Sequence, residues 1–204
     1  MEGPRKRIPE ERPGQILEAA LVVFGERGLA SARVEEVAER AGISKGTIYL
    51  YFPSKEDLFR AVIRSTWSGM LESIESVEPS GDARADLMAV CGSFWSFLRS
   101  PSFATAHRLV VSEIHSFPDM ACKFAECVRQ PILRHIGALL DRGVTQNVFT
   151  PGDGLVRARL LFSMLLQHAI WCARRAQLRD LDSYSDDEVL RQVLEFFLDA
   201  TAVR

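Results

Sequence analysis

Apolar residues recur every three to four positions along most of the chain, which is the spacing of amphipathic helices. Near the N-terminus, for example, Ile16, Ala20 and Phe24 fall on one helical face. Runs that alternate between apolar and polar residues, as strands do, are nearly absent. Capping residues and helix breakers divide the pattern into nine predicted helices, at residues 15–25, 34–41, 44–51, 54–77, 82–99, 102–116, 118–141, 155–177 and 185–202.

The predicted boundaries rest on local chemistry. Ser54 followed by Asp57 is a capping pattern for the fourth helix, and Gly28 is a C-terminal cap for the first. Gly143 is expected to end the seventh helix. Pro131 lies inside that helix and removes a backbone donor, so we expect a kink or a break there.

Composition excludes several classes of protein. The chain has 204 residues, 47% hydrophobic and 25% charged, so global disorder is excluded and a sizeable core is expected. No apolar run approaches the ~18–20 residues that a membrane span needs, and the charged N-terminus lacks a signal-peptide core, which predicts a cytoplasmic protein without membrane contact. The net charge of −2 means that any attraction to DNA must be local. The cluster Arg5, Lys6 and Arg7 on a flexible basic arm, residues 1–9, is one such feature.

The segment VEEVAERAGISKGTI, residues 34–48, predicts a helix-turn-helix. Ala38 is small where two helices approach, and Gly42 permits the positive φ of the turn. Ser44 is expected to cap the second helix, which leaves polar residues at the N-terminal end of a short helix that can enter a major groove. Any helical protein can show such spacing by chance, so the pattern favours DNA binding without proving it.

Catalytic and metal-binding patterns are not visible. The four histidines show no spacing typical of a metal site, and we expect them to be satisfied core or surface residues, with His107 or His168 as an alternative polar group in a pocket. No nucleophile and base arrangement or glycine-rich phosphate loop is present, so we expect neither an enzyme nor a metal or cofactor. The cysteines are predicted to be reduced, partly buried small hydrophobes: Cys91, Cys122, Cys127 and Cys172.

Residues 16–28, 34–48 and 44–59, the last reading SKGTIYLYFPSKEDLF, resemble the TetR family of bacterial transcriptional regulators. The resemblance covers roughly residues 10–65, and the stretch 108–119, RLVVSEIHSFPD, is similar to the AcrR-like subgroup. It implies an all-α fold, with a helix-turn-helix domain at residues 10–53 and a helical ligand-binding and dimerisation domain at residues 54–204.

The resemblance also implies roles for single residues. Lys45, Gly46 and Thr47 match positions that reach base edges or phosphates, with Ser44 as the cap, and most such contacts position a protein without specifying sequence. Further DNA contacts are implied for Tyr49, Tyr51 and Lys55, and Arg33 departs from a common Thr but can hold a phosphate or reach a base. Leu50 also departs from the family pattern, which puts a direct contact there in doubt. From the residues alone, Tyr49 can instead pack under the first helix and Lys55 can be merely solvated.

The C-terminal two thirds are rich in large apolar residues. The family resemblance implies a pocket between the fourth helix and those that follow, suited to a small lipophilic or aromatic effector. Its candidate lining residues are Trp67, Met70, Trp95, Phe124 and Trp171.

The last two helices are apolar on two sides, which predicts a homodimer interface. One stripe comprises Leu161, Leu165, His168, Val189, Val193, Phe197 and Thr201, and a second comprises Leu160, Met164, Leu190, Leu194 and Leu198. The alternative is a monomer with a single thick core.

These observations converge on a homodimeric repressor that binds a palindromic double-stranded operator and releases it when a small lipophilic or aromatic ligand binds. A regulator of the same fold that is controlled by a protein partner is the first alternative. An all-helical enzyme or scaffold with a vestigial helix-turn-helix is the second.

Overall fold

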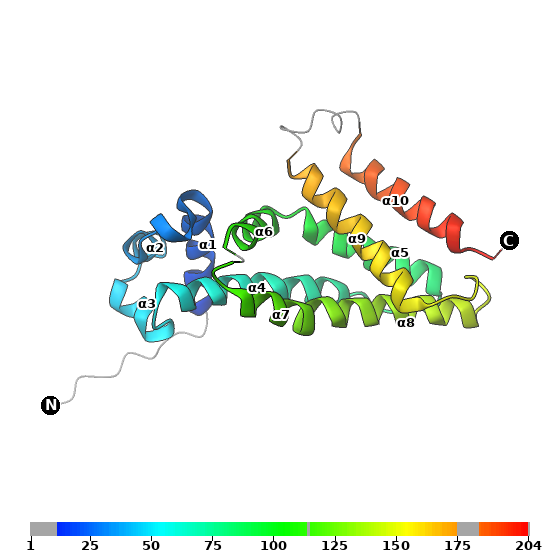
Figure 1. Cartoon of the computed structure of the whole chain (residues 1–204), viewed down its shortest axis with the longest axis horizontal. Helices are drawn as coiled ribbons and strands as arrows, with labels where there is room; N and C mark the ends of the chain where they lie inside the picture. The colour runs from blue at the N-terminus through cyan, green and yellow to red at the C-terminus, as the bar shows by residue number, and fades with distance from the viewer. Residues whose placement is uncertain (1–11, 114, 175–183, 204) are drawn as a thin grey trace. The chain divides into compact units, whose positions relative to one another are not determined.

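The computed structural model describes residues 12–113, 115–174 and 184–203, and these residues are helical apart from short connections (Figure 1). The predicted basic arm, residues 1–9, and the predicted end of one helix, residues 175–177, lie outside them. The helices are α1 (Arg12–Ser31), α2 (Val34–Arg40), α3 (Lys45–Tyr51), α4 (Lys55–Glu75), α5 (Ala83–Leu98), α6 (Pro101–Glu113), α7 (Pro118–Phe124), the π-helical turn η1 (Ala125–Arg129), α8 (Gln130–Thr145), α9 (Gly154–Cys172) and α10 (Asp186–Thr201).

The predicted all-α fold is confirmed. The segments α7, η1 and α8 follow one another without a break, so they form one long helix, and the part of the chain that the structure describes contains the predicted number of helices. Among the described residues the β-type pairing is limited to an isolated bridge between Phe149 and Ala202. No helix in the described ranges is long and apolar enough to cross a membrane.

The chain forms two compact units. The first contains the described residues of Met1–Thr66 together with Thr105–Phe117, and the second contains Trp67–Ala104 and the described residues that follow Phe117. The helices α4 and α6 therefore each contribute residues to both units.

In the first unit, α1 and the start of α4 enclose an aromatic core. The Phe24 and Phe59 rings meet edge to face with their centroids 5.9 Å apart, and Phe59 lies 5.2 Å from Phe117. Gly28 interrupts α1 with φ 74°, a left-handed value that favours glycine, as expected of a helix-ending residue. This bend directs the last residues of α1 toward α2.

Residues 105–117 complete the first unit by packing against α1. A Cβ atom on Gly25 would lie 2.5 Å from Thr105 Cγ2, so only glycine leaves room for this contact. Arg108 donates a hydrogen bond to the Gly25 carbonyl oxygen at 2.8 Å. Arg60 stacks over the Phe117 ring, with its guanidinium carbon 4.7 Å from the ring centroid.

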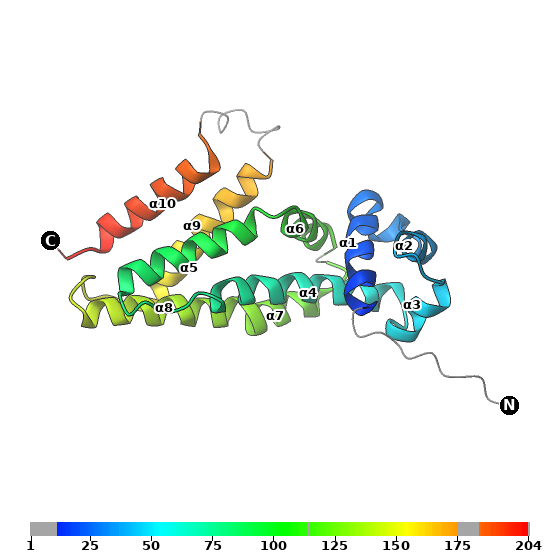
Figure 2. The same cartoon turned by 180° about the vertical axis from the view of Figure 1, so that it is seen from behind.

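The second unit is built on long helices and large buried side chains. Phe94 of α5 stacks on Phe162 of α9 with centroids 5.3 Å apart. The helices α9 and α10 lie side by side in both views (Figure 2). A buried carboxylate, Asp86, accepts hydrogen bonds from the Ser80 amide and hydroxyl and pairs with Arg142 of α8, which fastens the α4–α5 connection to α8.

The region around Pro131 differs from a simple kink. The turn before it is π-helical, and the Gln130 amide donates to the Ala125 carbonyl five residues back. Insertion of a π-type turn is a common way to accommodate a disturbed hydrogen-bond ladder, and it keeps α7 and α8 continuous.

The predicted end of α8, residue 141, is four residues too early. The helix continues through Gly143 to Thr145, and the amides of Val148 and Phe149 then return to the Gly143 carbonyl. A Cβ atom at Gly143 would lie 2.1 Å from the Phe149 ring, so glycine stands here because a ring covers the helix and not because the helix stops.

Candidate nucleic-acid interface

The helices α2 and α3 form the predicted helix-turn-helix. Gly42 adopts φ 65° in the turn, and its amide donates to the Glu39 carbonyl at 3.1 Å, while the Ile43 amide donates to Ala38 at 3.0 Å. The apolar residues that seal the inner side of the pair are buried: Val34, Val37, Ala38 and Ile48. The outer side of α3 is therefore free to meet a partner.

Ser44 caps α3 as expected. Its Oγ accepts a hydrogen bond from the Thr47 amide at 3.1 Å and lies 2.8 Å from the Thr47 hydroxyl. These two predicted contact residues thus hold each other in place at the start of the helix. Beside them, a Cβ atom on Gly46 would meet only Ser44 Oγ, at 3.8 Å, so the backbone here is open to close approach.

The exposed face of α3 is partly apolar and partly cationic. Leu50 is 74% exposed and Tyr49 is 41% exposed, so Tyr49 does not pack under the first helix. Lys45 Nζ lies 5.6 Å from the centroid of the Tyr49 ring. The predicted contact residues Lys45, Gly46 and Tyr49 therefore share one surface.

Lys45 also pairs with a residue that the sequence analysis missed. Glu35, in the first turn of α2, accepts a hydrogen bond from Lys45 Nζ at 2.6 Å. This bond lowers the pKa of the Glu35 carboxyl below its ordinary value and raises that of the Lys45 ammonium. The residues are ten positions apart, and only the crossing of two helices brings them together.

Arg33 precedes α2 and is exposed. Its backbone amide donates to the Glu36 carboxylate at 3.1 Å, which fixes the start of α2. Arg33 thus lies directly before α2 with an exposed side chain, and its role in DNA contact stays a prediction.

Two of the predicted contacts have unexpected surroundings. Lys55 Nζ donates to the carbonyl oxygens at the end of α1, those of Leu29, Ala30 and Ala32, at 2.8, 3.1 and 3.2 Å. It is therefore not merely solvated, because these bonds engage all three of its donors. The Tyr51 hydroxyl is buried and has no hydrogen-bond partner among the described residues, so it does not face solvent in this structure.

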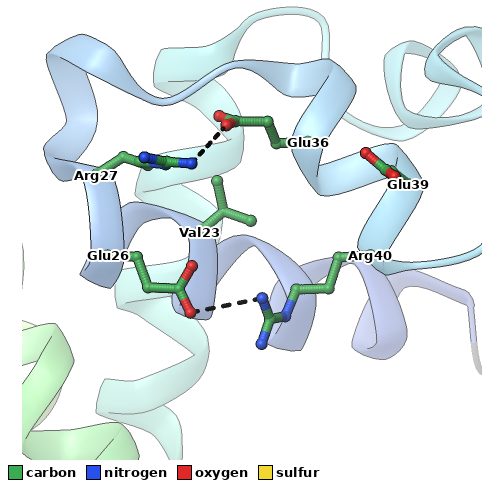
Figure 3. Close-up of a pocket in the computed structure, with 6 residues that line it drawn as sticks. All are labelled: Val23, Glu26, Arg27, Glu36, Glu39 and Arg40. Carbon is green, nitrogen blue, oxygen red and sulfur yellow. Dashed lines mark ion pairs between the residues drawn. The ribbon is translucent and has the colours of Figure 1, made fainter.

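A charged groove lies between α1 and α2, whose residues line it (Figure 3). Arg27 pairs with Glu36 across it at 3.4 Å, and Arg40 pairs with Glu26 at 3.5 Å. Since each of these cations faces a carboxylate, the groove presents alternating charge, and its ion pairs link α1 to α2.

The predicted pocket residues separate into two groups within the second unit. Trp67, Met70 and Trp95 are buried, and the Trp67 ring lies 4.9 Å from that of Phe124. The Trp95 indole nitrogen is buried without a hydrogen-bond partner in the described residues. Trp171 differs: it is 39% exposed and meets His168 of its own helix edge to face, at 5.2 Å.

The helices α9 and α10 bury one apolar side and expose another. Leu161, Leu165, Val193 and Phe197 of the first predicted stripe are buried within the unit. The second stripe divides, since Leu194 and Leu198 are buried whereas Leu160 is 57% exposed. The exposed apolar residues of the two helices are Leu155, Val156, Leu160, Trp171 and Phe196.

The cysteines only partly follow expectation. Cys91 is buried, and burial raises the pKa of its thiol to about 12. Cys122 and Cys127 are exposed on α7 and η1, so the prediction that they are partly buried is wrong for these two. Both lie on the outer side of their helix.

The fold and this interface define a helix-turn-helix protein with a helical second unit. Residues 16–62 match the bacterial regulatory proteins of the tetR family, and residues 85–202 match the AefR-like transcriptional repressor C-terminal domain. The chain belongs to the TetR family of transcriptional regulators, whose members are not enzymes. The AcrR-like subgroup has only loose support.

Individual relatives agree with this assignment. The HTH-type transcriptional activator FasR of Mycolicibacterium smegmatis is 36% identical over 98 residues, which are 47% of this chain and 45% of FasR. The fatty acid metabolism regulator protein of Bacillus subtilis is 33% identical over 94 residues, 45% of this chain and 48% of that protein. The matched part of the chain thus spans about half the length of these curated relatives.

A solved structure shows the same fold over nearly the whole chain. FadR from Bacillus subtilis, in complex with stearoyl-CoA, superposes with a TM-score of 0.70 at 23% identity. The match covers 91% of this chain and 97% of FadR. At this identity the likeness shows the fold alone.

Proposed function

We propose that the protein is a DNA-binding transcriptional regulator that reads operator DNA with α3. The observation that carries this proposal is the exposed outer face of α3, where Lys45, Gly46 and Tyr49 stand on a helix whose start is fixed by Ser44 and Thr47. Most contacts made there would go to phosphates and position the protein on the duplex.

The remaining predicted contacts are assigned by position. Arg33 binds backbone phosphate at the rim of the motif. Tyr51 and Lys55 reach phosphate only if the buried hydroxyl and the carbonyl-bound ammonium are released. We therefore rank these two below Lys45 and Tyr49.

An electrophoretic mobility assay with the DNA upstream of the protein's own gene tests this proposal. We expect a discrete shifted band that unlabelled upstream DNA removes and a scrambled duplex of equal length does not. Absence of a shift at low salt with any genomic fragment would refute DNA binding.

We further propose a homodimer formed through the exposed apolar face of α9 and α10. Phe196 is 70% exposed and Leu160 is 57% exposed, and burying such side chains against a second copy is favourable by about 25 cal/mol per Å². A two-fold dimer would also match a palindromic operator with half-sites separated by the helical repeat of DNA.

Phe196→Glu is expected to give a monomer by light scattering and to abolish the operator shift. Met88→Glu, at a 45% exposed methionine on α5, is the matched control and should remain dimeric. A dimeric Phe196→Glu variant would refute this interface.

A long-chain fatty acyl compound is the effector that we propose for the second unit. Trp67, Met70 and Phe124 supply apolar surface. The Trp95 N–H, which has no partner in the described part of the chain, offers one donor for a ligand carbonyl or carboxylate. Two matches from B. subtilis point to the same chemistry: one is named a fatty acid metabolism regulator protein, and the other is FadR in complex with stearoyl-CoA. We propose repression because the AefR-like transcriptional repressor match covers most of the second unit, although FasR is named as an activator.

Signalling is proposed to run along α4. This helix carries Lys55 in the first unit and Trp67 and Met70 in the second, so a ligand against its distal half can tilt it and change the separation of two recognition helices. Coupling of this kind is reciprocal, so operator DNA must lower ligand affinity by the same factor.

Titration with stearoyl-CoA tests the effector. We expect it to release the operator from the parent, to act several-fold more weakly on Trp95→Phe, and to fail on Trp67→Ala, which should still bind operator without ligand. Met88→Ala, at a 45% exposed position on α5, should respond like the parent. A Trp67→Ala variant that responds fully would refute the pocket, and a reporter assay decides between repression and activation.

A further inference from the structure

The ion pair between Glu35 and Lys45 stands at the surface proposed to meet DNA. Glu35 is the second residue of α2 and Lys45 is the first of α3, and their side chains remain 58% and 48% exposed. The pair is thus available to a partner without any rearrangement of the fold. The Tyr49 ring, 5.6 Å from the ammonium, limits where Lys45 can move.

A carboxylate is costly at this place if phosphates are the only contacts. It offsets the positive charge of Lys45 and repels the DNA backbone, which makes binding to arbitrary sequences weaker. Glu35 does suit the first turn of α2, but Glu36 in the same turn already provides an acidic group and bonds the Arg33 amide. Helix stability alone is therefore a weak reason for an acidic residue at position 35.

A carboxylate gains a favourable partner in the major groove at cytosine. Cytosine offers its N4 amino group as a donor, and the guanine paired with it offers O6 and N7 as acceptors. Within that base pair, the N4 donor and the O6 acceptor are joined by a hydrogen bond of about 2.9 Å. The Glu35 carboxylate and the Lys45 ammonium form the complementary arrangement, an acceptor and a donor 2.6 Å apart.

We propose that the Glu35–Lys45 pair reads one C·G base pair in each operator half-site, with Glu35 accepting from cytosine N4 and Lys45 donating to guanine. This inference rests on the proposed DNA binding and adds a specificity-determining residue, Glu35, to it. At an A·T pair adenine N6 can also donate to the carboxylate, but thymine offers the ammonium one acceptor, O4, where guanine offers two, O6 and N7, so the pair is matched best by C·G. The single acidic residue Glu35 thereby strengthens binding to an operator with this C·G pair and weakens binding to random DNA.

Selection of bound duplexes from a randomised DNA library, followed by sequencing, tests the proposal. Parent, Glu35→Gln, Glu35→Ala and Glu39→Gln are compared at one salt concentration, with salt series on the selected site and on a random duplex. Glu39→Gln is the matched control because it removes the same charge from the same helix at an exposed residue beside the charged groove between α1 and α2.

The parent should select a C·G pair at one position of each half-site. Glu35→Gln should lose about tenfold discrimination there and gain adenine, which a Gln amide can pair with. Glu35→Ala should lose the preference without a replacement. Both variants should bind the random duplex more tightly than the parent, whereas Glu39→Gln should select the parental sequence.

The outcomes separate this inference from the function on which it rests. If the parent selects a sequence and Glu35→Gln selects the same one, the assignment of Glu35 is overturned while DNA binding stands. An equal change in Glu39→Gln would show a general charge effect and would also overturn it. If the parent enriches no sequence and binds no duplex, both the proposed function and the inference fail.

Discussion

Both units cap helices with exposed polar groups, but among the described residues only the second buries a charged one. In the first unit, short polar contacts lie at the surface and fix helix ends: Ser44 caps α3, and Lys55 binds the carbonyls that end α1. In the second unit, Asp86 is 3% exposed and joins a connection to α8 from inside. The first arrangement orients an exposed helix, whereas the second holds long helices around large side chains.

The difference shows where each unit can tolerate change. A helix of seven residues such as α3 contributes little stability of its own, so its direction depends on its caps. The long helices of the second unit depend on close packing, and at Gly143 an added methyl group has no space. Substitutions of the same kind should therefore have different effects in the two units.

The largest expected effect is in the second unit. Gly143→Ala places a Cβ atom 2.1 Å from the Phe149 ring and should lower the free energy of unfolding by about 3 kcal/mol. Gly92→Ala, in α5 with no atom within 4 Å of the added carbon, is the control and should raise it by about 1 kcal/mol. Urea denaturation measures both, and equal values would contradict a tightly packed second unit.

Asp86→Asn should lower the melting temperature by about 5 °C at pH 7, because it leaves Arg142 without its charged partner. Hydrogen bonds from the Ser80 hydroxyl and amide, with Arg142, lower the pKa of Asp86 to about 2. A carboxyl with a folded pKa below its unfolded value of about 4 stabilises the fold above pH 4 and loses that effect as the pH falls to 2. The difference in melting temperature between parent and variant should therefore shrink as the pH falls from 4 to 2. A constant difference would contradict this role of the Asp86 carboxylate.

Lys55→Met tests the contacts of the first unit. Loss of three hydrogen bonds to the α1 carbonyls should cost about 2 kcal/mol of stability. Lys123→Met, which removes an exposed lysine 3.9 Å from Asp119, should cost less than about 0.5 kcal/mol, because surface ion pairs contribute little.

The same Lys55→Met variant also tests the DNA contact that the sequence predicts for Lys55. A phosphate contact would reduce the slope of log affinity against log salt by about one unit. A variant with parental stability and a reduced slope would show that Lys55 serves the DNA and that the carbonyl contacts contribute nothing measurable.

The smallest expected change in stability is at Gly46. Gly46→Ala should raise the free energy of unfolding by about 0.5 kcal/mol, because alanine favours the helix and meets only Ser44 Oγ, at 3.8 Å. Operator affinity should nevertheless fall, since the added methyl group separates the backbone from DNA. Parental affinity would show that the backbone of α3 does not approach DNA closely at this point.

Local signals explain what the sequence could predict. The caps at Ser44, Ser54 and Ser185 act within three residues, so their chemistry is visible in the order of the amino acids. The glycine at position 42 was predictable because the turn after α2 requires a positive φ. The two helices of the helix-turn-helix were therefore predicted with boundaries that agree with the structure to within one residue.

Long-range contacts explain what it could not. The pairing of Glu35 with Lys45 and of Lys55 with the end of α1 joins residues 10 to 26 positions apart. Likewise, the exposure of Trp171 and Phe196 depends on which sides of α9 and α10 are covered within the unit. Helical spacing identifies apolar sides but does not say which neighbour covers them.

The discontinuous first unit also limits how its reading motif can be exchanged between relatives. The tetR family match ends at residue 62, yet Thr105 and Arg108 pack on Gly25, and Phe117 lies on Phe59. A chimera joined directly after residue 62 would place a foreign segment on these contacts. To transfer DNA specificity to another protein, two segments must therefore be moved together, 12–66 and 105–117. Both belong to the same compact unit although they are separate in the sequence.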